Sequence, residues 1–158
     1  MSRRKHKVLL CLAVAVALAA MASCSRRPVY SHYEAIGQEG WHRTDTLRFT
    51  CPIRQAGQYR LRLGLRASTL YPFTQLTLIA RHQTHKSRDC HADTLTLDIT
   101  DHEGNINGEG VSIHQYEVPL TTVNAARCDT LRIDVFHGMT RQLLPGICDV
   151  GITVENPS

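Results

Sequence analysis

The sequence lacks the features that mark several classes of protein. None of its apolar runs reaches the ~18 residues that a membrane-spanning helix requires. Only ten glycines and six prolines occur among 158 residues, and 42% of the residues are hydrophobic, which excludes fibrous and disordered chains. The length corresponds to one domain of ordinary size.

Net charge is missing from most of the chain. The formal charge of +4 comes from Arg3, Arg4, Lys5 and Lys7, which leaves 14 of the 18 basic residues to balance the 14 acidic ones beyond residue 23. A nucleic-acid-binding protein needs a positive field that attracts phosphates over a distance. The sequence therefore excludes nucleic acid as a partner.

Catalytic motifs are also missing. The chain contains no Gly-x-Ser-x-Gly, no His-Glu-x-x-His and no phosphate-binding glycine loop. We therefore expect a protein that is not an enzyme, with no cofactor and no small-molecule substrate.

The N-terminus has the three regions of a secretory signal. A basic start is followed by an apolar run from Val8 to Ala22 and by the small-residue exit Met21-Ala22-Ser23-Cys24. The run would extend ~22 Å as a helix, which is shorter than the ~30 Å hydrocarbon core, so a retained membrane anchor is the weaker alternative. Residues 1–23 are predicted to be a signal peptide.

The exit sequence also resembles a bacterial lipobox. In such a segment the cysteine becomes the first residue of the mature protein, and its thiol receives diacylglycerol. The sequence thus predicts lipidation of Cys24, with palmitate or a similar acyl chain on the new amino terminus, because two or more chains hold a protein durably to a membrane. An ordinary cleaved signal that happens to precede a cysteine is the alternative.

Four cysteines remain for the folded domain in an oxidising compartment. Their spacing matches neither a zinc site nor a Cys-x-x-Cys redox pair. An even number favours two disulfides, with three possible connectivities, although four buried free thiols would give the same sequence. The residues are Cys51, Cys90, Cys128 and Cys148.

Two-residue alternation of apolar and polar residues dominates the mature chain and predicts seven strands. No segment after Cys24 shows apolar residues at helical spacing over three turns. We expect an all-β, single-domain antiparallel β-sandwich of about seven or eight strands over residues 45–158, preceded by a lipid-anchored spacer at 24–44. The alternating residues lie at 47–51, 59–67, 76–80, 95–99, 116–120, 131–135 and 150–154.

Two segments suggest metal binding but are better explained otherwise. Oxygen side chains recur from Asp101 to Asn107, yet Ile106 and Ser112 stand where an EF-hand needs glycine and a bidentate acid, so a loop between strands is expected. His82 and His85 lie three residues apart on a predicted strand end and point to opposite faces. No metal site is expected.

The longest predicted strand carries a row of arginines, Arg60, Arg62 and Arg66, on its polar face. The planar guanidinium binds carboxylates and phosphates in pairs, which suits a protein surface or an acidic headgroup. We favour the simpler interpretation, a solvated strand face with acids opposite on neighbouring strands.

An interaction patch is predicted after that strand. Tyr71, Pro72 and Phe73 form an aromatic-Pro-aromatic run between two strands, and Arg66 precedes them. Such a run should lie at a sandwich edge, where anchor residues are commonly found, although it would also suit the core.

The order of several short motifs resembles the gliding motility lipoprotein GldH family, from the lipobox to about Val154. They are Trp41, Asp45-Thr46-Leu47-Arg48-Phe49, Tyr71-Pro72-Phe73-Thr74-Gln75-Leu76, Asp101-His102-Glu103-Gly104, Leu144-Pro145-Gly146-Ile147 and Asp149-Val150-Gly151-Ile152. The resemblance implies an outer-membrane lipoprotein of Gram-negative gliding bacteria and their relatives.

The resemblance further implies a non-catalytic accessory or scaffold component of gliding-motility-type machinery in the cell envelope. Its partners would be the membrane, through the lipid anchor, and other envelope proteins. Only Cys24 carries over from the family, as the acylation site. Ser25-Arg26-Arg27 lacks the acidic residues that resemble a surface-export tag in these bacteria, which favours the periplasmic side of the outer membrane.

A glycan-binding envelope β-sandwich is the alternative function. Sandwiches often bind sugars on exposed aromatic rings, but aromatic residues make up only 6% of this chain, and most are needed for packing.

Overall fold

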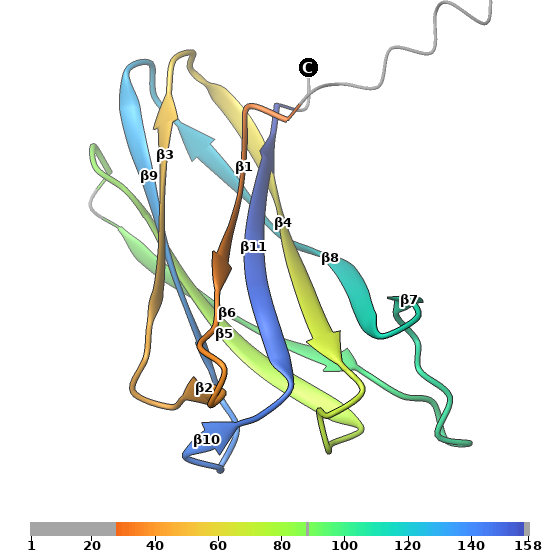
Figure 1. Ribbon diagram of the computed structural model, residues 1–158. Coiled ribbons are helices and arrows are strands. Elements are labelled where there is room, and N and C mark those ends of the chain that lie inside the picture. The colour runs from red at the N-terminus through yellow and green to blue at the C-terminus, as the bar shows by residue number, and fades with distance from the viewer. Residues whose placement is uncertain (1–27, 88, 157–158) are drawn as a thin grey trace, which may run out of the picture.

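The computed structural model describes residues 28–87 and 89–156, which form an all-β fold (Figure 1). Two antiparallel sheets face each other and enclose one hydrophobic core. The predicted all-β sandwich is confirmed. Within the described ranges there is no helix that could cross a membrane.

The two main sheets contain five and four strands, and a short two-stranded sheet accompanies them. The five-stranded sheet has the order β1-β11-β4-β8-β7, the four-stranded sheet the order β3-β9-β5-β6, and β10 pairs with β2. The strand bounds are β1 Tyr30–Ala35, β2 Trp41–His42, β3 Leu47–Ile53, β4 Gly57–Ser68, β5 Gln75–Thr84, β6 Cys90–Asp98, β7 Glu109–Gly110, β8 Ile113–Ala125, β9 Asp129–His137, β10 Leu143–Leu144 and β11 Ile147–Glu155.

All seven predicted strands are present, but the predicted spacer at 24–44 is wrong in its described part. β1 and β2 both lie within it, and β1 pairs with β11 along its whole length as the edge of the five-stranded sheet. β1 is an edge strand that buries little surface, and it contains no aliphatic residue larger than alanine. The sequence therefore shows no alternation of apolar and polar residues there, and the strand could not be predicted. The domain therefore begins before residue 45.

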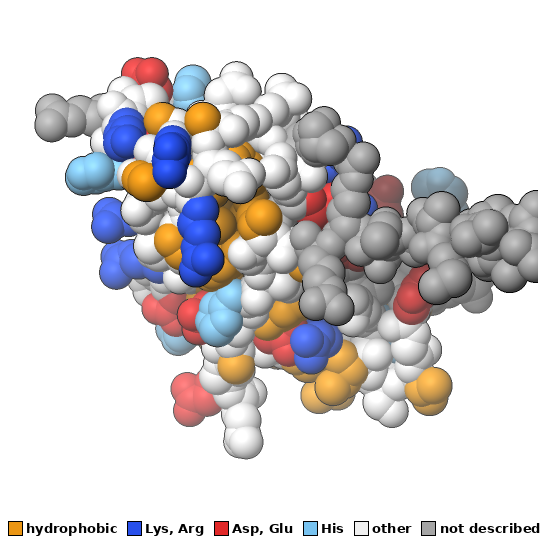
Figure 2. All heavy atoms as spheres, turned by 90° about the horizontal axis from the view of Figure 1, so that it is seen from above, with side chains coloured by type: hydrophobic (Ala, Val, Ile, Leu, Met, Phe, Trp, Pro, Cys, Tyr) orange, Lys and Arg blue, Asp and Glu red, His pale blue; other side chains and the backbone are white. Residues whose placement is uncertain are grey.

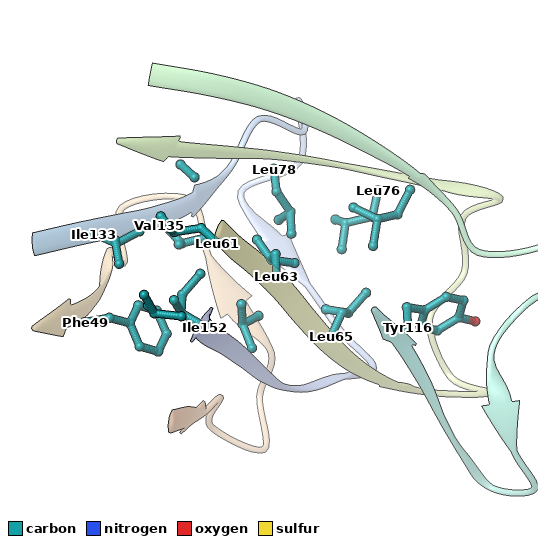
Figure 3. Packing of buried hydrophobic residues seen from close by; sticks show 14 of the residues in the cluster. Phe49, Leu61, Leu63, Leu65, Leu76, Leu78, Tyr116, Ile133, Val135 and Ile152 are labelled. Carbon is teal, nitrogen blue, oxygen red and sulfur yellow. The ribbon is translucent and has the colours of Figure 1, made fainter. Parts of the chain in front are cut away.

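The core consists of alternate residues from the inner faces of both sheets. Leu61, Leu63 and Leu65 of β4 lie opposite Leu76 and Leu78 of β5 (Figure 3), and each of these five side chains is fully buried. Sheets with one apolar face bury those faces best against each other. The alternation that predicts the strands is thus also the source of the core.

The sandwich has two ends with different connections. At the end where β1 begins and β11 finishes, which we call the entry end, the described link residues are 54–56, 85–87, 89 and 126–128 (Figure 1). At the other end, which we call the far end, lie the links between β4 and β5 and between β6 and β7, together with the β2–β10 pair. The first described residues therefore enter the fold at the end with short turns.

Candidate functional site

The predicted lipidation site, Cys24, lies outside the described residues. The described chain starts at Pro28, and the backbone N–H of Val29 donates to the carbonyl of Val154 at 2.8 Å. This bond fixes the point at which the chain enters the entry end of the sandwich. Any group attached at Cys24 is thus four residues from that end.

The four cysteines of the described domain are free, so the predicted disulfides are not formed in the structure. Cys51 is fully buried in the core, and burial raises the pKa of its thiol to about 11. Cys90 begins β6, Cys128 lies in the turn before β9, and Cys148 lies on β11 at the far end. An even number of cysteines in the sequence does not show that their thiols lie within bonding distance. Cys51 acts as a small apolar residue of the core.

The predicted interaction patch is divided between core and surface. Tyr71 is only 7% exposed; its hydroxyl donates to the carbonyl of Gln75 at 2.9 Å, and burial raises its pKa. Phe73 is half-buried and meets the Tyr71 ring edge to face at 5.5 Å, which leaves Pro72 as the exposed member of the run. Tyr71 is therefore a core residue and not an exposed anchor.

Arg66, the remaining member of the patch, lies on the outer face of the five-stranded sheet. Its Nε is 3.3 Å from the Asp149 carboxylate, and its guanidinium lies 4.6 Å from the centre of the Tyr33 ring. A side chain at Gly64 or Gly151 would collide with that ring. The two glycines thus form a shallow seat for Tyr33, and Arg66 covers it.

The other arginines of the β4 row also face acids across the sheet. Arg62 Nε lies 2.9 Å from the Glu117 carboxylate on β8, and Arg60 stands opposite Glu155 of β11 in the register. Burial raises the pKa of Asp149, while the neighbouring Arg66 acts in the opposite direction. These pairs support the simpler interpretation of the row, because each arginine has an acid on a neighbouring strand.

A second group of arginines, missed in the sequence, lies on the outer face of the four-stranded sheet. Arg48 of β3 and Arg81 of β5 flank Asp134 of β9 from both sides, and Arg132 projects from the same face. Arg81 stacks over the Phe136 ring at 4.9 Å. The three arginines belong to three strands that are distant in the chain, so no local pattern could have grouped them.

The histidines of the β5–β6 hairpin come together in a way that the spacing argument missed. His82 and His91 are cross-strand partners whose rings stack at 5.6 Å, and His82 Nε2 lies 2.9 Å from the Asp93 carboxylate. His85 lies beyond β5, in the turn. Among the described residues, no three His, Cys, Asp or Glu side chains are arranged to hold a metal ion.

The Gly-rich segment after β6 is a structured turn, as predicted. The Asp101 carboxylate accepts hydrogen bonds from the backbone N–H groups of Glu103 and Asn105, each at 2.8 Å, and from the Asn105 side-chain amide. These bonds, that of the Asn105 side chain first, lower the pKa of Asp101. The carboxylate is thus engaged in closing its own loop.

Aromatic rings provide no open platform on the described surface. Trp41, Phe49, Tyr59, Tyr71 and Tyr116 are buried, and the remaining four rings are half-buried. Tyr33, whose ring packs over Gly64 and Gly151 on an outer sheet face, is covered by Arg66. The surface therefore does not favour the glycan-binding alternative, which needs an exposed ring.

Solved structures are only weakly similar to this chain. A carbohydrate-binding module specific for non-crystalline cellulose (CBM28) has a TM-score of 0.42 and 10% identity over 80% of this chain and 72% of its own. The GH115 4-O-methyl-α-glucuronidase BtGH115A has a TM-score of 0.47 and 10% identity, and the match covers 86% of this chain and 18% of that one. Eiger TNF of S. frugiperda has a TM-score of 0.35 and 8% identity, and the match covers 84% of this chain and 98% of that one. These similarities are too weak to indicate a function.

Comparison with curated proteins gave no match. The model of the GldH lipoprotein family, in contrast, matches residues 28–154. The match spans every strand of the sandwich from β1 to nearly the end of β11. The chain therefore belongs to the GldH lipoprotein family.

Proposed function

We propose that this GldH-family protein is acylated at Cys24, is held in the outer membrane on its periplasmic side, and acts by contact as a non-catalytic accessory or scaffold of gliding-motility-type machinery. The observation that carries the proposal is the family match over residues 28–154, which begins four residues after the lipobox cysteine. Membership implies a lipoprotein anchored in the envelope. The GldH family is not a known enzyme family, which supports a role through binding.

Exposed apolar side chains at the far end suggest where a partner binds. Leu70, in the link between β4 and β5, is 76% exposed. Val111, in the link between β7 and β8, is 90% exposed, and Ile113, the first residue of β8, is 51% exposed. Ile113 pairs with Ser68 in the register, so the two segments lie side by side. Clustered apolar side chains at the end away from the lipid anchor are typical of a protein contact surface.

The anchor is tested by replacing Cys24 with serine in the producing cell. We expect the wild-type protein to float at the density of the outer membrane in a gradient. The Cys24→Ser protein should be missing from that band, because it either is soluble in the periplasm or keeps its signal peptide and stays with the inner membrane, which separates at a different density. Equal flotation of both proteins would contradict acylation at Cys24.

The contact role is tested by photo-crosslinking in intact cells. A photoreactive residue replaces Leu70 at the far end or, as a matched control, Val29, which is 52% exposed at the entry end. We expect discrete crosslinks to envelope proteins from position 70, and their loss when Val111 is changed to serine. If position 70 gives no more crosslinks than position 29 while the protein remains anchored, the scaffold role is wrong.

A further inference from the structure

Among the described residues, three exposed cations lie in the three turns of the entry end. Arg54 belongs to the turn after β3, Lys86 to the turn after β5 and Arg127 to the turn after β8. No ion pair joins any of them to an acid within the described part of the chain. Figure 2, which looks down on this end, shows Lys and Arg side chains gathered over one part of it.

Hydrogen bonds hold two of these cationic turns together. The ammonium of Lys86 donates to the carbonyl of Arg127 at 2.6 Å, and the backbone N–H of Lys86 donates to the Asp129 carboxylate at 3.2 Å. Asp129 is only 5% exposed. The acid beneath the turns is thus covered, while both cations stay on the surface.

The two ends of the sandwich differ in the sign of their charge. In the described links of the entry end, Arg54, Lys86 and Arg127 outnumber the one acid, Asp89. In the links of the far end, acids outnumber bases. The far-end acids are Glu39, Asp45, Asp101 and Glu103, and the bases are Arg43 and Arg141. The described links therefore carry a positive balance at the entry end and a negative balance at the far end.

The positive end is the one nearest to the proposed anchor. Four residue steps separate Cys24 from Pro28, and a fully extended chain spans at most ~14 Å over that length. The intervening sequence adds Arg26 and Arg27. An acyl group on Cys24 would therefore keep the entry end within about one to two Debye lengths of the headgroups, where surface cations are attracted by anionic lipids.

A recess beside the turns suits a headgroup phosphate. Its volume is about 480 Å³, and it is lined by Gln83, His85, Thr130 and Arg132 at the entry end of the four-stranded sheet. Arg132 and His85 supply N–H donors, and Thr130 supplies a hydroxyl donor. Phosphate oxygens accept hydrogen bonds from all of these groups.

We infer that Arg54, Lys86 and Arg127 bind the anionic headgroups of the membrane that holds the anchor, so that the sandwich stands with its entry end against the bilayer and its far end directed away. The inference rests on the proposed lipid anchor at Cys24. It deepens that proposal by fixing the orientation of the domain and the lipid class that it contacts.

The test measures how close each end lies to the headgroups. Membrane-purified full-length protein, with Cys90 and Cys148 replaced by serine, is labelled with a fluorophore at Cys128, which is exposed in the turn beside Arg127. The control carries the label at the far end as Gly37→Cys in a Cys128→Ser background, because a side chain at Gly37 meets open space. Both are reconstituted into phosphatidylcholine vesicles, with or without phosphatidylglycerol, that contain a headgroup quencher.

With phosphatidylglycerol present, we expect stronger quenching at position 128 than at position 37. The difference should become smaller in high salt, in phosphatidylcholine alone and in the Arg54→Gln, Lys86→Gln, Arg127→Gln triple variant, where only the tether holds the entry end near the bilayer. A difference that none of these three changes reduces would contradict headgroup binding by the cations. The matched variant Arg43→Gln, Arg141→Gln at the far end should keep the full difference.

Equal quenching at positions 128 and 37 in both lipid mixtures would overturn the inference and leave the entry end free for an acidic protein segment. Flotation of the same samples reports the anchor separately. Protein that floats with both vesicle types but shows equal quenching contradicts only the orientation. Protein that floats with neither contradicts the anchor as well.

Discussion

The two ends of the sandwich are built for different tasks. At the far end, Trp41 is 1% exposed, its indole N–H donates to the carbonyl of Asp45 at 3.1 Å, and its ring meets His137 edge to face at 5.5 Å. At the entry end the links are short turns whose charged residues point into solvent. The comparison indicates that substitutions in the buried group around Trp41 at the far end change stability, whereas substitutions of the exposed cations at the entry end change membrane binding and leave stability nearly unchanged.

Removal of the Trp41 ring is the strongest way to test this difference. Trp41→Ala leaves a cavity where β2 and β10 cover the core, and we expect a loss of about 3–5 kcal/mol in the free energy of unfolding. Urea denaturation followed by circular dichroism measures the loss. Trp41→Phe, which keeps a ring but loses the hydrogen bond to Asp45, should cost about half as much or less. A loss below ~1 kcal/mol for Trp41→Ala would show that the far end is not closed by this side chain.

A glycine in the link between β10 and β11 provides the next test. Gly146 has a φ of +82°, and a Cβ there would collide with the backbone N of Tyr71. Gly146→Ala should therefore lower the free energy of unfolding by about 1–3 kcal/mol. Gly37→Ala at the same end is the matched control, since a side chain at Gly37 meets open space, and it should have no such effect. Equal losses from both variants would contradict the assigned role of Gly146.

His137 should make the far end sensitive to pH. Burial lowers the pKa of this histidine below its usual 6.5, so the unfolded chain binds the proton more readily than the folded one. Stability should thus fall as pH decreases below about 6.5, by at most ~1.4 kcal/mol per pH unit. His137→Phe should flatten that dependence, whereas His102→Gln in the exposed loop should not. Unchanged pH dependence in His137→Phe would show that another group is responsible.

The smallest effect on stability is expected at the entry end. The Arg54→Gln, Lys86→Gln, Arg127→Gln triple variant changes only exposed side chains, and each substitution should shift the free energy of unfolding by no more than ~0.5 kcal/mol. The urea midpoint measures it. A loss comparable to that of Trp41→Ala would remove the distinction between the two ends.

Most of the fold could be predicted because a strand that lies with one face on the core has apolar residues at every second position. A strand with one face in the core must alternate, as β4 does from Tyr59 to Ala67. β1 could not be predicted from this signal because it is an edge strand without large aliphatic residues. β2, β7 and β10 have two residues each, which is too short for any period to show.

Less of the candidate site could be predicted, because contacts between distant segments decide it. The pairing of Arg62 with Glu117 follows from strand order, and the sequence could only anticipate acids somewhere on the neighbouring strands. Tyr71 is buried although it lies in a loop, since a loop has no period that separates core from surface. The cysteine count predicted disulfides, but it carries no information on the distances between strands.

The intact mass of the N-terminal peptide of the membrane-purified protein tests the lipid anchor most directly. We predict a chain that begins at Cys24 and carries the added mass of a diacylglyceryl thioether and an amide-linked acyl chain. A chain that begins at Met1, or at Cys24 with an unmodified thiol, would contradict the anchor and with it the orientation of the sandwich at the membrane.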